Sequence, residues 1–261
     1  MGIVNVTPDS FSDGGRLSDA RAAIDHALKL REEGADILDV GGESTRPGAA
    51  PVPEDEEIRR VLPVIEGLAR RGCVVSIDTK KPEVMRAALA AGAAMVNDVM
   101  ALRAPGALEA VAGSDAAVCL MHMQGDPQTM QQAPVYSDVV GEVEQFLANR
   151  VEACMVAGIR RERLVIDPGF GFGKALEHNL ALLAHLDRLA ESGLPVLAGL
   201  SRKSMLGALT GRPVDQREFA GVAAHLAAVA RGARLLRVHN VAAMRDALAV
   251  WNAVEEQRDG T

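Results

Sequence analysis

Short apolar runs recur along the chain at intervals that leave room for a helix and a connection. There are eight of them, and most stop at a polar or charged residue. Their endpoints are Asn5, Asp39, Asp78, Asn97, His122, Asp167, Ser201, and Arg237 with His239. A parallel strand that is covered on both faces is apolar along its length, and α/β barrels keep their chemistry where such strands end. The pattern therefore predicts eight parallel strands with functional side chains at their carboxyl ends.

The segments between these runs show apolar residues at helical spacing. The clearest, 54–72, begins with acidic residues and ends with Arg70, Arg71 and Gly72, as the helix dipole favours. The predicted helices cover 19–34, 54–72, 82–92, 139–158, 180–193, 217–232 and 242–257. An open, doubly wound sheet alternates in the same way. The polar strand ends favour a (β/α)8 TIM barrel of the α/β class instead.

Length and composition agree with one barrel. The chain has 261 residues and no Pro/Gly/Ser-rich linker, so we expect a single domain over 1–261. Hydrophobic residues make up 48% and aromatic residues only 3%, which leaves the core to aliphatic side chains. Met1 falls directly on the first predicted strand. Either the native protein carries a further segment before that strand, which we expect, or the bottom of the barrel is unusually bare.

Charge and cysteine content limit the possible partners. The net charge of −7 provides no basic surface for nucleic acid or for an anionic membrane. Cys73, Cys119 and Cys154 are odd in number and far apart, which argues against a disulfide framework or a zinc site, and we expect them to be buried. Neither a signal peptide nor an apolar run of membrane-spanning length is visible. These features predict a cytoplasmic protein.

Two predicted connections are much longer than a barrel requires. Residues 6–18 and 40–55 are rich in Gly, Pro, Ser and Thr and show no regular periodicity. Such loops are either tolerated surface insertions or binding loops and lids. Asp9, Asp13, Glu43, Thr45 and Arg46 are concentrated there, which favours the functional interpretation.

The segment DPGFGFGK, residues 167–174, has the composition of a binding loop. Its glycines allow sharp turns and a close approach to a ligand, and Phe170 and Phe172 can exclude water. The spacing matches neither a Walker loop nor a GxGxxG turn, so phosphate binding is weakly supported. A flat polar heterocycle against an apolar wall fits better.

Together with DPGFGFGK, seven further motifs give the chain a specific resemblance. They are NVTPDSFSDGG, DVGGESTRPGA, SIDT, NDV, LMHMQG, SRKS and RVH, and they span essentially the whole chain. In order and spacing the chain resembles the dihydropteroate synthase family of pterin-binding enzymes. The resemblance implies a (β/α)8 barrel that condenses 6-hydroxymethyl-7,8-dihydropterin diphosphate with 4-aminobenzoate. The products would be 7,8-dihydropteroate, in folate biosynthesis, and pyrophosphate.

The resemblance implies a buried pterin site with Asp78, Asn97, Val99, Met121, Asp167, Phe172, Gly199 and Lys203. Carboxylates accept N–H bonds from an aminopyrimidine edge, and an asparagine can both donate and accept, so these residue types suit a pterin. The alternative is that Asp78 and Asp167 merely cap the helices that follow them.

The remaining roles also follow from the resemblance. Diphosphate binding is implied for Asn5, Thr45, Arg46, Arg237 and His239, and binding of 4-aminobenzoate for Phe11, Thr45, Pro47, Phe172, Ser201 and Lys203. The catalytic set would be Asp78, Asp167, Lys203 and Arg46. The implied cofactor is Mg²⁺ with Asn5 as its protein ligand, which agrees with the preference of Mg²⁺ for few protein oxygens plus phosphate and water. The family is usually homodimeric.

Two other functions remain open. A pterin-dependent methyltransferase on the same barrel would share Asp78, Asn97 and Asp167, but it would not need the STRPG and SRK segments, which are present. A non-catalytic pterin-binding paralogue should have lost loop residues such as Arg46 or Phe11, and both are present. Asp39 and His122 receive no role from the sequence.

Overall fold

The computed structural model describes residues 1–6, 16–44, 50–125, 130 and 133–259. Several residues that the sequence singles out lie outside this part of the chain. They are Asp9, Phe11, Asp13, Thr45, Arg46 and Pro47.

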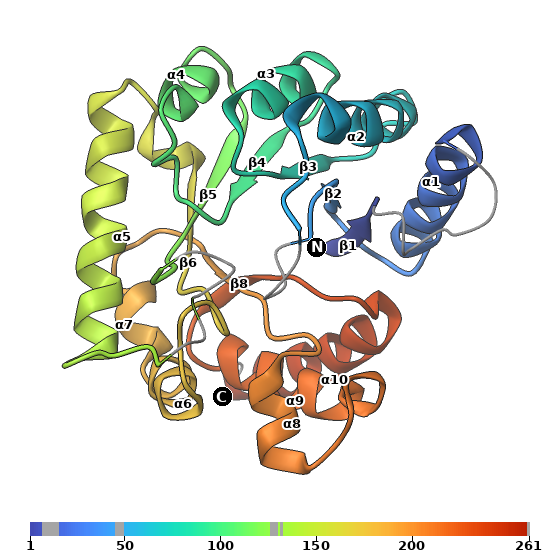
Figure 1. Cartoon of the computed structure of the whole chain (residues 1–261). Helices are drawn as coiled ribbons and strands as arrows, with labels where there is room; N and C mark the ends of the chain where they lie inside the picture. The colour runs from blue at the N-terminus through green and yellow to red at the C-terminus, as the bar shows by residue number, and fades with distance from the viewer. Residues whose placement is uncertain (7–15, 45–49, 126–129, 131–132, 260–261) are drawn as a thin grey trace.

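A curled, all-parallel sheet of eight strands forms the centre of the molecule (Figure 1). The strands are β1 (Gly2–Asn5), β2 (Leu38–Gly41), β3 (Val75–Asp78), β4 (Met95–Asp98), β5 (Ala117–Met121), β6 (Leu164–Asp167), β7 (Val196–Ala198) and β8 (Ala233–Leu236). They neighbour one another in sequence order. A parallel bridge between Gly2 and Val238 joins the end of the sheet to its beginning. The TIM-barrel-like fold predicted from the strand and helix alternation is confirmed.

Helices surround the sheet on its outer side (Figure 1). They are α1 (Arg16–Glu32), α2 (Glu54–Ala69), α3 (Pro82–Ala90), α4 (Ala107–Ala112), α5 (Val139–Val156), α6 (Leu176–Ala184), α7 (Leu186–Ala190), α8 (Ser204–Thr210), α9 (Glu218–Val229) and α10 (Val241–Asp259), with short 3-10 turns at Arg161–Arg163 and Val214–Gln216. The expected helix over 180–193 is divided at His185, whose backbone leaves the helical region at φ −117° and ψ 31°. Because the apolar spacing continues across this break, the sequence carries no sign of it.

The core has two layers, as a barrel requires. Between sheet and helices lies a large aliphatic cluster, and inside the barrel Met95, Cys119, Val165 and Leu197 pack together. The three cysteines are free thiols. Cys119 and Cys154 are buried as predicted, whereas Cys73 is only partly buried because it follows α2 at the surface.

The sequence places the end of the second strand wrongly. An end at Asp39 was expected, but β2 continues to Gly41. Side chains of a strand alternate between its two faces, so Asp39 lies one inward-facing position deeper in the barrel than Gly41. Gly41 pairs in register with Asp78, and Asp39 with Ser76. Glycine has a low strand propensity, so the sequence did not predict that the strand continues to Gly41. The contacts of Asp39 described below compensate for the burial of its carboxylate.

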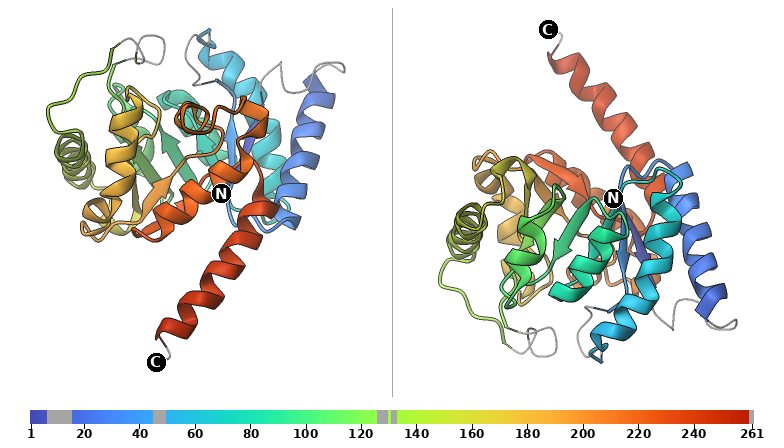
Figure 2. Two further views of the ribbon diagram at one scale, coloured as in Figure 1. Left: turned by 90° about the horizontal axis from the view of Figure 1, so that it is seen from below. Right: turned by 90° about the horizontal axis from the view of Figure 1, so that it is seen from above.

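The last helix, α10, extends away from the body of the molecule in both views of Figure 2. Its exposed apolar side chains include Val250 and Val254. Within the described residues, no helix is both long and apolar enough to cross a membrane.

The turn after β6 supplies a test of the fold. Gly169 has φ +69°, and a Cβ added there would overlap the carbonyl oxygen of His122. We expect Gly169→Ala to lower the free energy of unfolding by about 3 kcal/mol or more. The loss combines backbone strain at residue 169 with displacement of the His122 carbonyl group. Urea unfolding followed by circular dichroism measures this change.

Gly193→Ala is the matched control, because Gly193 has a similar φ of +75° but open space around the added Cβ. It should cost only about 1 kcal/mol, the strain of the left-handed backbone alone. Equal losses in the two variants would show that the overlap with His122 is relieved at no cost.

Candidate active site

Polar side chains meet at the carboxyl ends of three central strands. Asp78 and Asn97 are register partners on β3 and β4, and Asp167 ends β6 beside Met121 on β5. Neighbouring strands lie about 4.8 Å apart, so the parallel register brings these groups to one mouth of the barrel. Asn97 and Asp167 are buried, and Asp78 is partly buried. We call Asp78, Asn97 and Asp167 the floor of the site.

Arg237 joins this floor rather than standing apart from it. Its Nη2 donates to Oδ2 of Asp78 at 2.7 Å, and its Nε donates to Oδ2 of Asp39 at 2.6 Å. Burial disfavours the charged guanidinium, but the two carboxylates outweigh this effect and raise its pKa above the ordinary value. The sequence predicts Arg237 among the diphosphate ligands, and nothing in the sequence indicates its two ion pairs.

Asp39 has no solvent exposure and contacts two members of the site. Its Oδ2 accepts from Arg237 and also from Nδ2 of Asn97 at 3.1 Å. Its Oδ1 is buried without a hydrogen-bond partner among the described residues. Asp39, which the sequence left without a role, is therefore part of the support beneath the floor.

The two carboxyl groups of the floor have raised pKa values. Burial penalises the charged form of Asp78 and raises its pKa to about 7, although Arg237 opposes this shift. Burial also raises the pKa of Asp167, opposed by the N–H of Gly169, which donates to Oδ1 at 2.7 Å, and by Lys203. Neither carboxylate caps the following helix, because the N-caps of α3 and α6 are Lys81 and Ala175. The capping alternative is therefore wrong for both residues.

An apolar wall stands next to the floor. Val99 and Met121 are buried and form a separate small cluster, against which Phe172 packs. Met123 and Met130 belong to the same cluster, and the sequence did not single them out. Three of the predicted wall residues thus lie together, whereas Gly199 follows β7 and lies next to Arg237.

Lys203 lies between the wall and the floor. Its ammonium nitrogen is 4.1 Å from the centroid of the Phe172 ring, a cation–π distance. Burial lowers its pKa to about 8, although the charge of Asp167 acts in the opposite direction. The predicted neighbours Asp167, Phe172 and Lys203 are therefore close to one another.

Another lysine, Lys174, is buried and organises the glycine-rich loop. Lys174 Nζ is 2.9 Å from Nδ1 of His122 and donates to the carbonyl oxygens of Gly169 and Phe172, both at 3.0 Å. It also lies 3.3 Å from the carbonyl oxygen of His122. Burial lowers the pKa of Lys174 to about 7 and that of His122 to about 3. The lysine thus links the end of β5 to the loop after β6, and this link gives His122 a structural role. The sequence did not reveal the link, because nothing in it shows that Lys174 points inward.

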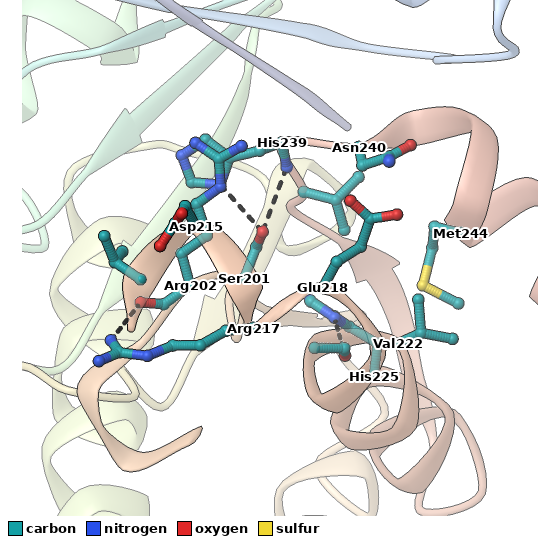
Figure 3. A pocket seen from close by; sticks show the side chains of 13 residues that line it. Ser201, Arg202, Asp215, Arg217, Glu218, Val222, His225, His239, Asn240 and Met244 are labelled. Carbon is teal, nitrogen blue, oxygen red and sulfur yellow. Dashed lines mark hydrogen bonds between the residues drawn. The ribbon is translucent and has the colours of Figure 1, made fainter. Parts of the chain in front are cut away.

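Ser201 and His239 meet at the other side of the mouth. Ser201 Oγ is 2.9 Å from Nδ1 of His239 (Figure 3). Both residues line a small pocket of about 30 Å³ together with residues of α9 such as Glu218 and His225. This volume accommodates about one or two waters, so the pocket is too small for a substrate. Asn5, the last residue of β1, is exposed at the mouth.

An ionic network joins the stems of the second long loop. Lys81 Nζ donates to Glu43 and to Glu57, each at 2.5 Å, and to the carbonyl oxygen of Val52 at 2.6 Å. Glu43 and Val52 lie on either side of residues 45–49, so the network joins the two described ends of this connection. The lysine pair Lys80 and Lys81 after SIDT could have indicated this network, but the sequence analysis assigned it no role.

The described residues contain no cluster of three or more His, Cys, Asp or Glu side chains that could hold a metal ion. A metal at this mouth would instead depend on single oxygens such as the amide oxygen of Asn5, with the remaining ligands from phosphate and water. A donor set of this kind fits Mg²⁺ on a diphosphate and does not fit a structural zinc.

The chain as a whole is similar to known proteins. Residues 1–239 match the family model described as pterin binding enzyme. The chain is 51% identical over 254 residues to a dihydropteroate synthase of Haemophilus influenzae, covering 97% of this chain and 92% of that protein.

Solved structures give the same result. The dihydropteroate synthase of Xanthomonas albilineans with 4-aminobenzoic acid superposes with a TM-score of 0.92 at 62% identity, over 98% of this chain and 92% of the other. A structure of the enzyme from that organism in complex with 7,8-dihydropteroate gives a TM-score of 0.89 at 59% identity, over the same shares.

The buried lysine gives a prediction at this site. Lys174→Met keeps most of the side-chain volume but removes the only donor to Nδ1 of His122 and to the carbonyl oxygen of Phe172 among the described residues, whereas the carbonyl oxygen of Gly169 keeps the N–H of Phe172. We expect a loss of about 3 kcal/mol in the free energy of unfolding, because buried acceptors without donors are costly. The exposed Lys29, which forms only a surface pair with Glu33, is the control. Lys29→Met should change stability by less than about 0.5 kcal/mol, and a similarly small effect at Lys174 would contradict its anchoring role.

Proposed function

The chain belongs to the dihydropteroate synthase family of pterin-binding enzymes, and from this premise we propose how the mouth of its barrel performs the family's reaction. Its activity is the condensation of 6-hydroxymethyl-7,8-dihydropterin diphosphate with 4-aminobenzoate to give 7,8-dihydropteroate and pyrophosphate. The observation that carries the proposal is the grouping of Asp78, Asn97 and Asp167 at the carboxyl ends of β3, β4 and β6 beside an apolar wall.

The floor binds the pterin in this proposal. Asp78 and Asp167 accept N–H bonds from the aminopyrimidine edge, which relieves the cost of two buried carboxylates. The ring lies against Val99, Met121 and Phe172, with Gly199 completing the outline. Lys203 adds a donor close to Asp167, supported by its position over the Phe172 ring.

The diphosphate occupies the outer rim. Asn5 and His239 lie at the mouth, and Thr45, Arg46 and Arg237 complete the proposed set. Arginine suits this position because its planar guanidinium binds anionic oxygens in pairs. Mg²⁺ held by the Asn5 amide oxygen would neutralise charge on the diphosphate and make it a better leaving group. The exposed position of Asn5 supports this assignment.

We propose that the C–O bond between the pterin methylene carbon and the diphosphate breaks first, and that pyrophosphate leaves with the bonding electron pair. The resulting cation is delocalised into the pterin ring and stabilised by the carboxylates of Asp78 and Asp167. The amine nitrogen of 4-aminobenzoate then attacks the methylene carbon and releases a proton to solvent. An aromatic amine is already unprotonated near neutral pH, so the step requires no strong general base.

The second substrate completes the arrangement. Phe11, Thr45, Pro47, Phe172, Ser201 and Lys203 are proposed to bind 4-aminobenzoate, with Arg46 acting on the reaction when the loops close. Exclusion of water matters here because water would compete with the amine for the cation. The bond between Ser201 and His239 links this region to the diphosphate rim.

The assembly and its location are further proposals. We propose a single-domain protomer over 1–261 that forms a homodimer through the surface of α9 and α10. Phe219 on α9 is 87% exposed and Val250 on α10 is 67% exposed, and apolar surface of this kind marks interfaces. Three free thiols support a reducing compartment, the cytoplasm.

A direct assay tests the function. The protein incubated with pterin diphosphate, 4-aminobenzoate and Mg²⁺ should release pyrophosphate and form dihydropteroate in equal amounts. Removal of Mg²⁺ with EDTA should reduce the rate at least about tenfold, because the leaving group then keeps its full charge. Pterin binding without product would indicate a non-catalytic paralogue. Transfer of a methyl group in place of condensation would indicate a methyltransferase.

The raised pKa of Asp78 predicts a pH dependence. If the ionised carboxylate accepts N–H bonds from the pterin, kcat/KM for pterin diphosphate should fall about tenfold for each unit below pH 7, because protonation removes the acceptor. Asp78→Asn should abolish this limb and lower kcat/KM at pH 8 by at least about 100-fold. A profile that is unchanged in the variant would remove Asp78 from pterin binding.

A further inference from the structure

Asn97 could present either of two opposite atoms to a ligand. An asparagine side chain carries an amide nitrogen that donates and a carbonyl oxygen that accepts, and the two are nearly the same size. If Asn97 accepts a hydrogen bond, the floor prefers a ligand with an N–H donor at that position. If Asn97 donates, the floor prefers a ligand with an acceptor atom there. Some other group must decide between these two states.

The group beneath Asn97 is the carboxylate of Asp39. Its Oδ2 lies 3.1 Å from Nδ2 of Asn97 and also accepts a hydrogen bond from Nε of Arg237 at 2.6 Å. An oxygen that accepts from a guanidinium, which has only donors, meets the amide of Asn97 as an acceptor too. The amide nitrogen must therefore face Asp39, and a reversed amide would place two oxygens against each other in a buried site.

We propose that Asp39 is a positioning residue that orients Asn97 with its carbonyl oxygen toward the ligand and so sets the hydrogen-bond pattern that the floor recognises. The floor then offers three acceptors, the carboxylates of Asp78 and Asp167 and the oxygen of Asn97. The matching ligand is a flat heterocycle with several N–H donors along one edge. This inference rests on the proposed pterin site.

Asp39 also orients the guanidinium of Arg237. The Nε of Arg237 is committed to Asp39 and one Nη2 hydrogen to Asp78, so the guanidinium plane is held by two carboxylates from neighbouring strands. Its remaining N–H groups keep a constant direction, which a single ion pair would not ensure. One buried carboxylate therefore orients two functional side chains.

Asp39→Asn and Ser76→Ala form a matched pair of variants. The Asp39→Asn substitution keeps the size of the side chain, but the new amide can donate to or accept from Asn97, so the orientation is no longer imposed. Ser76 is the register partner of Asp39 on β3, is fully buried, and its Oγ has no hydrogen-bond partner among the described residues. Ser76→Ala thus perturbs the same layer of the barrel without altering Asn97 or Arg237.

Titration calorimetry with 6-hydroxymethyl-7,8-dihydropterin diphosphate and Mg²⁺ measures the effect. Asp39→Asn should raise the dissociation constant of the pterin diphosphate by about tenfold or more. The KM for 4-aminobenzoate should stay within about twofold of the wild-type value, because Asn97 contacts only the pterin in this proposal. Ser76→Ala should match the wild type in both. Equal weakening in the two variants, or none in Asp39→Asn, would overturn the proposal. A wild type that does not bind the pterin diphosphate would instead contradict the proposed function, and this inference with it.

A measurement on the wild type covers the case in which Asp39→Asn does not fold. The side-chain NH₂ of Asn97 is identified in a ¹⁵N spectrum by its disappearance in Asn97→Asp. Without ligand, its hydrogens should exchange about 100-fold more slowly than those of the exposed Asn252, because they are buried against a carboxylate. Exchange as fast as at Asn252 would mean that Asp39 does not hold the amide.

Discussion

The arrangement of the site depends on compensation of buried charge. Asp39 and Asp78 lie within the mouth of a barrel whose interior is otherwise mostly apolar, and Arg237 pairs with both. An isolated carboxylate in such surroundings would be strongly destabilising or would become neutral. The pairing links β2, β3 and β8, so the groups expected to bind substrate are also those that hold these strand ends together. A substitution at any of the three charges would affect both properties.

Two lysines, Lys174 buried and Lys203 partly buried, extend the same principle to the other side of the mouth. Lys174 is surrounded by carbonyl oxygens and the His122 imidazole, and Lys203 lies over Phe172 close to Asp167. Burial lowers the pKa of both lysines and raises the pKa of both floor carboxyls. These groups are held in place before a substrate arrives, and such preorganisation is the main means by which enzymes stabilise developing charge. Lys174 belongs to the motif DPGFGFGK and holds the loop after β6. Lys203 belongs to the motif SRKS and lies in the proposed site.

Much of this protein follows from local sequence. Strand and helix periodicity gave the order of the elements, and the acidic start of α2 and the glycines after several helices marked their limits. The polar residues at Asp78, Asn97 and Asp167 identified the catalytic end of the barrel, because parallel strands bring their carboxyl ends to one side. The motifs then gave the family, which the matches over nearly the whole chain confirm.

Tertiary structure decided what local patterns could not encode. A run of apolar residues does not show how far a strand continues, so Asp39 was expected at the end of β2 and not inside the barrel. Sequence spacing also gives no direction for a side chain, and Arg237 and Lys174 contact partners that lie 198, 159 and 52 positions away along the chain. The sequence by itself determined which chemical groups stand at the strand ends. Only the closed sheet determined which of them meet, because burial makes unpaired charges costly and forces each to take the partner that the register brings within reach.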